Sequence, residues 1–390
     1  MSQQYIRQIL IAGGGYAGIQ AALILERLLK GKNTKILLID KNKYHTLLPS
    51  LPEVISKRGF SIIDYKDIIQ AKKIDFIQTT ISSIDLDKRE LFTSDSPYPL
   101  KYDYLIISLG SKPFLPNIRG LTKYAFQFNT IQDAEKIANK LLDTSLKENI
   151  IIGGGGATGV ELAGEIASVL KQPYSRSNQY HPNTVTLVSP NLLPGFPDPT
   201  VKWAKAYLES LQVKLVLGSE CYITEVKPDS IHLKNGREIK TTMFIWTGGV
   251  TTIPLLQKIG LKTGNKGRVA VNKFLQAIGR GEVFVIGDAA LIVDNKGQPL
   301  PTNAYFAEQH GKIAAKNIYA LIEGRKLQEY RPEQPGSNFA ISIGSNFAVS
   351  RVGGLDLFGY SASKLKKLIK MKYLRDIGGS NLAGKEYYKF

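Results

Sequence analysis

Cysteine is almost absent from this sequence. Its 390 residues include a single one, Cys221, which excludes an internal disulfide, a CxxC redox pair and any cysteine-based cluster or zinc site. Histidine is scarce too, and the spacing of the four histidines, His45, His181, His232 and His310, does not suggest a metal site. We therefore expect no metal-binding residues, and any redox chemistry must proceed without a protein dithiol.

Long apolar runs are also missing. Gly, Ser or a charged residue interrupts every strand-like run, and no run approaches the roughly 18 to 20 residues that span a bilayer. The N-terminus, Met1 to Gln8, lacks the charged and apolar regions of a signal peptide. With 43% apolar and 22% charged residues, the composition is typical of a globular enzyme. We expect a protein that stays in the cytoplasm and does not cross the membrane.

Acidic residues are few relative to basic ones. The 33 Asp and Glu residues stand against 51 Lys and Arg residues, for a net charge of +18. Such an excess indicates an anionic partner, which could be nucleic acid, an acidic protein or an anionic membrane surface. Charge alone does not choose among them, but no nucleic-acid-binding motif accompanies it.

The first strong motif is a glycine-rich loop near the N-terminus. A β-prone run, Gln8 to Ala12, leads into Gly13 to Gly18 in the pattern GxGxxG and then into an Ala/Leu-rich helix, Ile19 to Leu29. A second strand, 35–39, ends on Asp40. This is the full fingerprint of a dinucleotide-binding Rossmann module, in which the helix N-terminus holds the phosphates and the acid accepts hydrogen bonds from the ribose.

A second copy of this motif follows at residue 154. The strand Asn149 to Ile152 precedes Gly154 to Gly159 and a helix that carries Glu161 and Glu165. Its next strand, 184–188, comes after an insertion around 171–182 and ends on Ser189 instead of an acid. We favour NADH here and leave NADPH open. Glu161 is the better site candidate, although both glutamates could instead form a solvated helix face.

Together the two fingerprints resemble the two-dinucleotide-binding flavoproteins, the glutathione reductase-like or pyridine nucleotide-disulfide oxidoreductase superfamily. The connecting stretch Tyr102 to Gly110 and the closing stretch Val283 to Ala289 share this resemblance, which spans about residues 6 to 325. It implies an α/β fold with two Rossmann-type domains, for FAD and NAD(P)H, plus a C-terminal membrane-associating region. The FAD-binding domain would comprise residues 1–117 and 256–328, the NAD(P)H-binding domain 118–255, and the C-terminal region 329–390.

Three stretches resemble type II NADH:quinone oxidoreductase, which passes electrons from NADH through FAD to quinone without pumping protons. They are Tyr44 to Val54, Gly154 to Glu165 and Pro301 to Gly311. The third departs from the family pattern, because Tyr305 stands where the family usually has its first glutamine, whereas Gln309 matches the second. Alternatively, Ala304, Phe306, Ala307 and Gln309 could simply face a helix core.

The resemblance assigns the site residues. It implies catalytic roles for Glu161 and Gln309, and quinone contacts for Tyr305, Phe306 and Gln309. Contacts to FAD are expected at Gly13, Gly15, Tyr16, Ala17, Gly18, Asp40, Lys41, His45, Pro49, Gly110, Asp288, Thr302 and Ala304. Contacts to NADH are expected at Gly154, Gly156, Ala157, Thr158, Gly159, Glu161, Ser189 and Gly248.

The C-terminal segment is strongly basic. Strand-forming residues, 339–352, precede a helix predicted over Ser361 to Ile377. A helical wheel predicts one apolar face, formed by Ala362, Leu365, Leu368, Ile369, Tyr373 and Ile377. The opposite face carries Lys364, Lys367 and Lys370. Two further lysines, Lys366 and Lys372, interrupt the apolar sector. Such a helix suits a peripheral protein on the cytoplasmic side of an anionic membrane, where the quinone would be met. A core-packing helix with a solvated lysine face is equally consistent.

Several alternatives stay open at this point. A sulfide:quinone oxidoreductase would share the fold but use redox cysteines, and an NAD(P)H-dependent reductase of a small acidic redox protein would suit the basic surface. A nucleotide-binding redox sensor with negligible turnover is the alternative that is not an enzyme. His310 could donate a proton to reduced quinone, the helix that begins near Asn303 could direct its positive end at the flavin, and the chain could form a homodimer.

Overall fold

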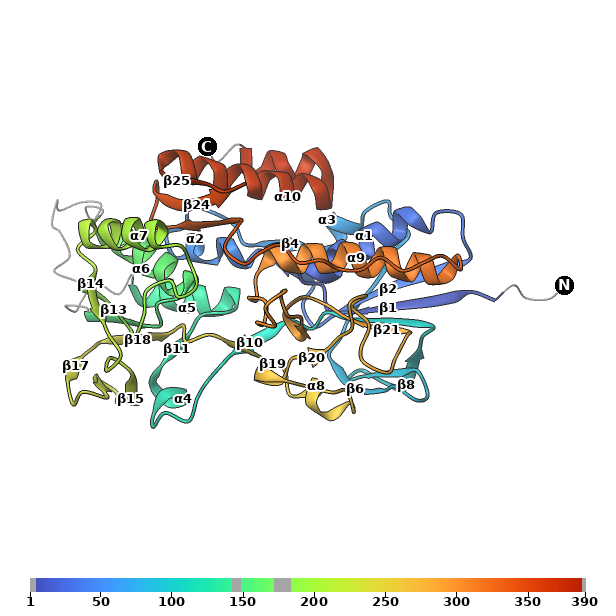
Figure 1. Ribbon diagram of the computed structural model, residues 1–390, viewed down its shortest axis with the longest axis horizontal. Coiled ribbons are helices and arrows are strands. Elements are labelled where there is room, and N and C mark those ends of the chain that lie inside the picture. The colour runs from blue at the N-terminus through green and yellow to red at the C-terminus, as the bar shows by residue number, and fades with distance from the viewer. Residues whose placement is uncertain (1–4, 142–148, 172–183, 388–390) are drawn as a thin grey trace.

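The computed structural model describes residues 5–141, 149–171 and 184–387, and the side chains of these residues as far as 384. His181 and the insertion from residue 172 to 182 lie outside the described residues. Within the described part, two parallel sheets lie along the long axis of the molecule, and a C-terminal layer spans both (Figure 1). This confirms the α/β class with two Rossmann-type modules.

The first Rossmann sheet has five parallel strands in the order β21-β9-β1-β2-β5. Its strands are β1 (Arg7–Ala12), β2 (Thr34–Asp40), β5 (Asp75–Gln78), β9 (Tyr104–Ile107) and β21 (Val283–Val285). Helices α1 (Tyr16–Leu28) and α9 (Ala304–Ile322) pack against each other on this module. Since β21 and α9 come from much later in the chain, two separate segments build this module. Strands β1, β2, β9 and β21 are largely apolar and buried because both faces are covered, whereas the edge strand β5 is mostly exposed.

The second Rossmann sheet repeats this arrangement in the order β11-β18-β12-β13-β14. Its strands are β11 (Phe126–Gln127), β12 (Asn149–Gly153), β13 (Thr184–Ser189), β14 (Lys214–Leu217) and β18 (Met243–Trp246). Helices α5 (Ile131–Leu141), α6 (Ala157–Leu170) and α7 (Asp198–Ser210) flank it. Two antiparallel strands, β10 (Ser111–Pro113) and β19 (Val250–Thr252), connect the two modules.

Smaller elements complete both modules. Two antiparallel three-stranded sheets consist of β6 (Ile81–Asp85), β7 (Glu90–Thr93) and β8 (Ser96–Lys101), and of β15 (Ile223–Val226), β16 (Ser230–Leu233) and β17 (Glu238–Lys240). The rest are β3 (Tyr44–Thr46), η1 (Leu48–Ser50), α2 (Leu51–Ile55), β4 (Ile62–Asp64), α3 (Tyr65–Ile69), α4 (Leu121–Tyr124), α8 (Leu255–Lys258), η2 (Asn265–Gly267), β20 (Val269–Ala270), η3 (Gly287–Ala289) and β22 (Ala290–Leu291).

The C-terminal region forms an antiparallel sheet and one long helix. Strands β23 (Phe339–Ser342), β24 (Ala348–Val352) and β25 (Leu355–Gly359) precede α10 (Tyr360–Tyr387), as the sequence predicted. Helix α10 is interrupted at Gly379, whose φ is 73°. In Figure 1 it lies on the outer edge of the molecule. It packs against α1 and α3 of the first module and pairs through Lys366 with Glu161 of α6 in the second. Among the described residues, none of the helices has the length and apolarity that a bilayer span requires.

The predicted orientation of α10 is partly wrong. Leu368 and Ile369, expected on the apolar face, are 58% and 47% exposed, whereas Lys370, expected opposite, keeps only 10% of its side chain exposed. Lys366, which interrupts the apolar sector, does lie inward, with 14% of its side chain exposed. Burial of Tyr373 agrees with the prediction. The reason is electrostatic: acidic partners on other elements draw the two lysines inward.

Candidate functional site

The first glycine loop, Gly13 to Gly18, connects β1 to α1 at the carboxyl edge of the first sheet. A Cβ on Gly18 would lie 1.9 Å from the Gly13 carbonyl oxygen, so this position admits only glycine. Gly13 has a φ of +104°. A Cβ on Gly15, in contrast, would meet nothing within 4 Å, and Gly15 caps α1 without a side-chain hydrogen bond. The loop therefore offers open space and free helix N–H groups, which suit a pyrophosphate.

Asp40 lies beside this loop at the end of β2. Its Oδ2 accepts a hydrogen bond from the Gly14 N–H at 2.8 Å and its Oδ1 accepts one from the Asn42 N–H at 2.8 Å. Burial raises the pKa of Asp40, while these backbone N–H groups oppose that rise. Tyr65, which the sequence reasoning missed, donates its hydroxyl to the Gly14 carbonyl at 2.8 Å. The carboxylate is thus held at the loop, and Lys41 next to it is exposed.

His45 supports the same loop from behind. The ring is fully buried, with Nδ1 3.0 Å from the Gly14 carbonyl oxygen and Nε2 2.9 Å from the Tyr373 hydroxyl of α10. Tyr16 packs edge-on against His45 and stacks on Tyr373. Burial lowers the pKa of His45 to about 4, so the neutral ring donates to Gly14 and accepts from Tyr373. Both nitrogens are occupied within the protein, and any influence on a cofactor passes through Gly14.

Asp288 and the start of α9 form the far end of the first site. The Ser111 hydroxyl donates to Asp288 Oδ2 at 2.7 Å, and burial raises the pKa of Asp288. Asn303 caps α9 by accepting the Phe306 N–H at 3.0 Å. Helix α9 contacts η3, which carries Asp288. Of the other expected residues, Gly110 has a φ of +67°, Pro49 lies in η1, and Thr302 and Ala304 are half-buried at the start of α9.

A small cavity lies between Asp288 and α9. Its volume of about 10 Å³ leaves room for at most about one water molecule, and its lining includes Arg268, Asp288, Thr302 and His310. His310 is 4% exposed, and neither of its ring nitrogens has a hydrogen-bond partner among the described residues. Burial lowers the pKa of His310 to about 3. Because the His310 ring is uncharged at neutral pH, it is poorly suited to donate a proton to a reduced quinone.

The three residues expected at quinone occupy different environments on α9. Tyr305 is 36% exposed and donates its hydroxyl to Glu333 at 2.6 Å, whereas Phe306 lies in the core at 4% exposure. Gln309 is half-buried and accepts the Tyr330 hydroxyl at 3.4 Å. The core alternative therefore holds for Phe306 and for Ala307, which is 7% exposed, whereas Ala304 and Gln309 are half-buried. Of the two aromatic residues, Tyr305 is the one exposed to solvent.

Glu308, which the sequence reasoning passed over, lies between α9 and α10. Burial raises the pKa of Glu308 to about 7, and charge interactions link it to Lys312 of α9 and to Lys372 and Asp376 of α10. Its sequence signal was an acid directly after the apolar run Tyr305 to Ala307. At neutral pH this carboxyl group can hold or release a proton.

The second glycine loop repeats the first. A Cβ on Gly159 would lie 1.9 Å from the Gly154 carbonyl oxygen, and one on Gly156 would meet nothing within 4 Å. Gly154 has a φ of +128°, and Gly156 caps α6 without a side-chain hydrogen bond. Ala157 and Thr158 open α6, Gly248 follows β18, and Ser189 ends β13 at 7% exposure. This loop offers a second place for a pyrophosphate.

Glu161 and Glu165 do not form a solvated helix face. Glu161, 12% exposed, pairs with Lys366 of α10 and accepts the Ser342 N–H of β23 at 3.1 Å. Glu165, 3% exposed, forms a two-pronged ion pair with Arg58, which also donates to the Ser345 carbonyl. The side chains of α6 thus turn toward the C-terminal region and the segment after α2.

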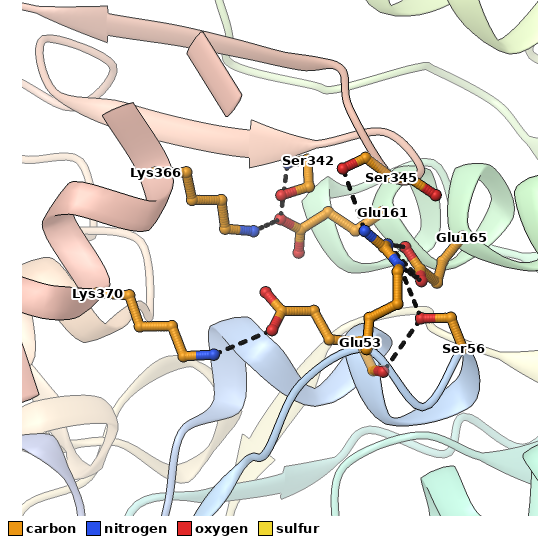
Figure 2. Close-up of polar contacts among 9 residues, drawn as sticks. Glu53, Ser56, Glu161, Glu165, Ser342, Ser345, Lys366 and Lys370 are labelled. Atoms are coloured by element: carbon orange, nitrogen blue, oxygen red, sulfur yellow. Dashed lines mark hydrogen bonds and ion pairs between the residues drawn. The ribbon is translucent and has the colours of Figure 1, made fainter. Parts of the chain in front are cut away.

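A third pair completes this cluster, which we call the charge junction. Glu53 of α2 pairs with Lys370 of α10 at 3.0 Å. Figure 2 shows Lys366 and Lys370 reaching from one face of α10 toward the acids of α6 and α2. The charge junction consists of Glu53, Arg58, Glu161, Glu165, Lys366 and Lys370. It joins both modules to the C-terminal helix at one place.

Removing one charge from the junction should destabilise the protein. We expect Glu165→Gln to lower the free energy of unfolding by about 2–3 kcal/mol, below the 3–5 kcal/mol of a fully buried pair because Arg58 keeps 32% of its side chain exposed. Equilibrium urea unfolding measures the change. Glu209→Gln, in an exposed pair with Lys205 at 4.0 Å, is the matched control and should cost less than about 0.5 kcal/mol. Equal losses in both variants would contradict a structural role for the junction.

Two neighbouring glycines should separate folding from ligand binding. Gly18→Ala places a Cβ against backbone and should lower stability by about 1–3 kcal/mol. Gly15→Ala should change the stability of the ligand-free chain by less than about 1 kcal/mol but raise the Kd for FAD at least about tenfold, because its Cβ enters the space for the pyrophosphate. Unfolding midpoints and flavin fluorescence titration test this. Unchanged FAD affinity in Gly15→Ala would place the ligand elsewhere.

Comparison with known proteins points to one superfamily. The family model described as pyridine nucleotide-disulphide oxidoreductase matches residues 7–311. The type II NADH:quinone oxidoreductases of Staphylococcus saprophyticus and Staphylococcus aureus are each 28% identical, over 97% of this chain and 98% of theirs.

Solved structures share the fold. NDH2 from Plasmodium falciparum in complex with NADH has a TM-score of 0.86 at 19% identity, over 99% of this chain and 98% of that one. The sulfide:quinone oxidoreductase of Aquifex aeolicus has a TM-score of 0.81 at 20% identity, over 97% and 92%. The whole described chain, C-terminal region included, therefore has counterparts of the same architecture.

Proposed function

The chain belongs to the pyridine nucleotide-disulphide oxidoreductase family, and from that premise we propose that it is an FAD-dependent type II NADH:quinone oxidoreductase that pumps no protons. One observation carries this proposal: relatives with that name match 97% of the chain, including the C-terminal region that the family model leaves out. The single cysteine supports it, because a dithiol-using member of the family needs a pair.

The residues of the two glycine loops fit the two nucleotides. Bound FAD would accept a hydride from NADH and pass the electrons on. The open space at Gly15 and the N-terminus of α1 suit the FAD pyrophosphate, and Asp40 suits its ribose. Gly156 and the N-terminus of α6 suit the pyrophosphate of NADH. The corresponding domains would be residues 1–117 with 256–328 for FAD, and 118–255 for NADH.

Glu161, Gln309 and Tyr305 remain our candidates around the reacting groups. Glu161 follows Gly159 by two residues, and its carboxylate is fixed by Lys366 and the Ser342 N–H. Tyr305 presents an exposed aromatic ring near the start of α9, where a flat quinone ring could stack. The half-buried Gln309 accepts a hydrogen bond from Tyr330 and would approach the quinone from the protein side of the site.

Sulfide oxidation is the chemistry that the sequence supports least. Cys221 is 8% exposed and lies just before β15, on the module assigned to NADH. A lone thiol cannot form an internal disulfide, so this chain lacks the redox cysteines that a sulfide:quinone oxidoreductase is expected to use.

Anaerobic flavin reduction tests the proposal. We expect NADH to bleach the flavin absorbance of the FAD-loaded chain within seconds, and a soluble quinone added afterwards to restore it. Sulfide, supplied alone, should leave the flavin oxidised. Stopped-flow absorbance measures both half-reactions. Bleaching by sulfide and not by NADH would overturn the proposal, and bleaching by NADH without reoxidation by any quinone would leave a reductase with another acceptor.

We also propose that α10 and β25 rest on an anionic membrane from the cytoplasmic side. Leu355, Tyr360, Leu368 and Ile369 are between 47% and 73% exposed, and lysines accompany them in a chain of net charge +18. Apolar side chains that enter the lipid surface, together with cations that meet its headgroups, are typical of peripheral membrane proteins. The quinone would then be taken directly from the bilayer.

An acidic substitution on this face should release the protein from vesicles. We expect Leu368→Asp with Ile369→Asp to reduce co-sedimentation with vesicles containing phosphatidylserine by about tenfold or more, since two apolar contacts are lost and two repulsive charges gained. Tyr98→Asp is the matched control, because Tyr98 is 79% exposed on β8, on the side of the molecule away from α10 (Figure 1). A similar loss in both variants would argue against docking through α10.

A further inference from the structure

The two glycine loops share one backbone register, which makes two residues equivalent. The Gly13 N–H donates to the Ile39 carbonyl at 2.8 Å, and the Gly154 N–H donates to the Val188 carbonyl at 2.9 Å. Ala12 pairs with Ile39, and Gly153 pairs with Val188, in the same parallel geometry. The residue after each acceptor therefore occupies the same place in the two modules. These residues are Asp40 and Ser189.

In the first module this place holds a negative charge. Asp40 accepts the Gly14 N–H and stays at the loop, where a carboxylate binds the free hydroxyls of an adenosine ribose. The same charge repels a 2′-phosphate. Asp40 thus fits FAD, whose adenosine carries no such phosphate.

In the second module the same place is neutral. A Cβ on Gly155 would lie 2.9 Å from the Ser189 Oγ and 2.2 Å from the Asn191 carbonyl oxygen, so Ser189 and the following turn lie against the glycine loop. A hydroxyl can accept from a ribose hydroxyl or donate to a phosphate oxygen. The next residues, Pro190, Asn191 and Leu192, carry no charge, and Asn191 is exposed.

The end of the neighbouring strand, β14, brings no unpaired acidic side chain to this turn. The Gly218 N–H after β14 donates to the Pro190 carbonyl at 3.1 Å. Glu220, two residues further on, is 56% exposed and pairs with Lys234 at 3.1 Å. The turn that begins at Ser189 thus lacks the charge that excludes a 2′-phosphate in NADH-selective Rossmann sites.

Resting on the proposed function, we propose that the second site accepts NADPH as well as NADH and that Ser189 sets this dual specificity. The nicotinamide half of the two nucleotides is identical, so both place the same hydride at the flavin. The site can distinguish NADH from NADPH only at the adenosine ribose, where NADPH carries its 2′-phosphate. Where an acid such as Asp40 would repel this phosphate, Ser189 offers a hydroxyl that can bind either nucleotide. Ser189 is thereby a specificity-determining residue.

Equilibrium binding to the full FAD-loaded chain tests this inference. Isothermal titration calorimetry with NAD⁺ and NADP⁺ should give Kd values within about tenfold of each other for the natural chain. Ser189→Asp should weaken NADP⁺ about 100-fold, as expected for two negative charges brought together, and change NAD⁺ much less. Ser189→Asn, of similar size but uncharged, is the matched control and should keep the natural ratio of the two Kd values. Anaerobic flavin reduction by NADPH and NADH should follow the same ratios.

Three results would count against dual specificity set by Ser189 or against the proposed function. A natural chain that binds NAD⁺ more than about tenfold tighter than NADP⁺ would overturn the inference while leaving the proposed function intact. An equal loss of NADP⁺ binding in Ser189→Asp and Ser189→Asn would overturn the role of Ser189. If Ser189→Asp does not fold, the ratio in the natural chain decides. Binding of neither nucleotide would count against the proposed function itself.

Discussion

Three largely buried carboxylates, on Glu53, Glu161 and Glu165, constrain the rest of this structure; their side chains are 26%, 12% and 3% exposed. A buried charge is tolerated only when paired, so each acid requires a cation from another element. Two of these cations, Lys366 and Lys370, lie one helical turn apart on α10. Their pairing fixes the rotation of α10 about its axis. Leu368, on the opposite side of the helix from these lysines, consequently faces outward together with Ile369. The ion pairs therefore determine which surface of α10 could meet the membrane.

The two Rossmann modules show how one backbone solution serves two ligands. In both loops a Cβ added to the third glycine of the motif would lie 1.9 Å from the carbonyl oxygen of the first glycine. In both loops a Cβ added to the middle glycine would point into open space. These requirements come from the turn and the pyrophosphate, which the two nucleotides share. The difference lies at the ribose, where a charge at Asp40 and a hydroxyl at Ser189 occupy the same register position. The loop geometry is therefore repeated within the chain, and the proposed difference in nucleotide specificity would depend on this one side chain.

Local patterns predicted those features that local forces determine. Both glycine loops, the strands around them and α10 could be read from the sequence, because backbone sterics and apolar periodicity act over a few residues. The charge junction could not, since its partners are separated by 107 to 317 residues. The helical wheel placed Lys370 opposite the apolar face because a wheel takes no account of acidic partners on other elements. The motif containing His45 was recognised, but its actual partner, Tyr373, lies 328 residues away.

His45 ties the first nucleotide loop to the same C-terminal helix. A neutral imidazole donates from one nitrogen and accepts at the other, which satisfies both the Gly14 carbonyl and the Tyr373 hydroxyl without burying a charge. Because burial lowers the pKa of His45 to about 4, this form prevails at neutral pH. Helix α10 is therefore fixed at two points, at the charge junction through its lysines and at the FAD loop through Tyr373. Under the proposed function, the surface that meets the lipid and the loop that holds the flavin are parts of one rigid connection.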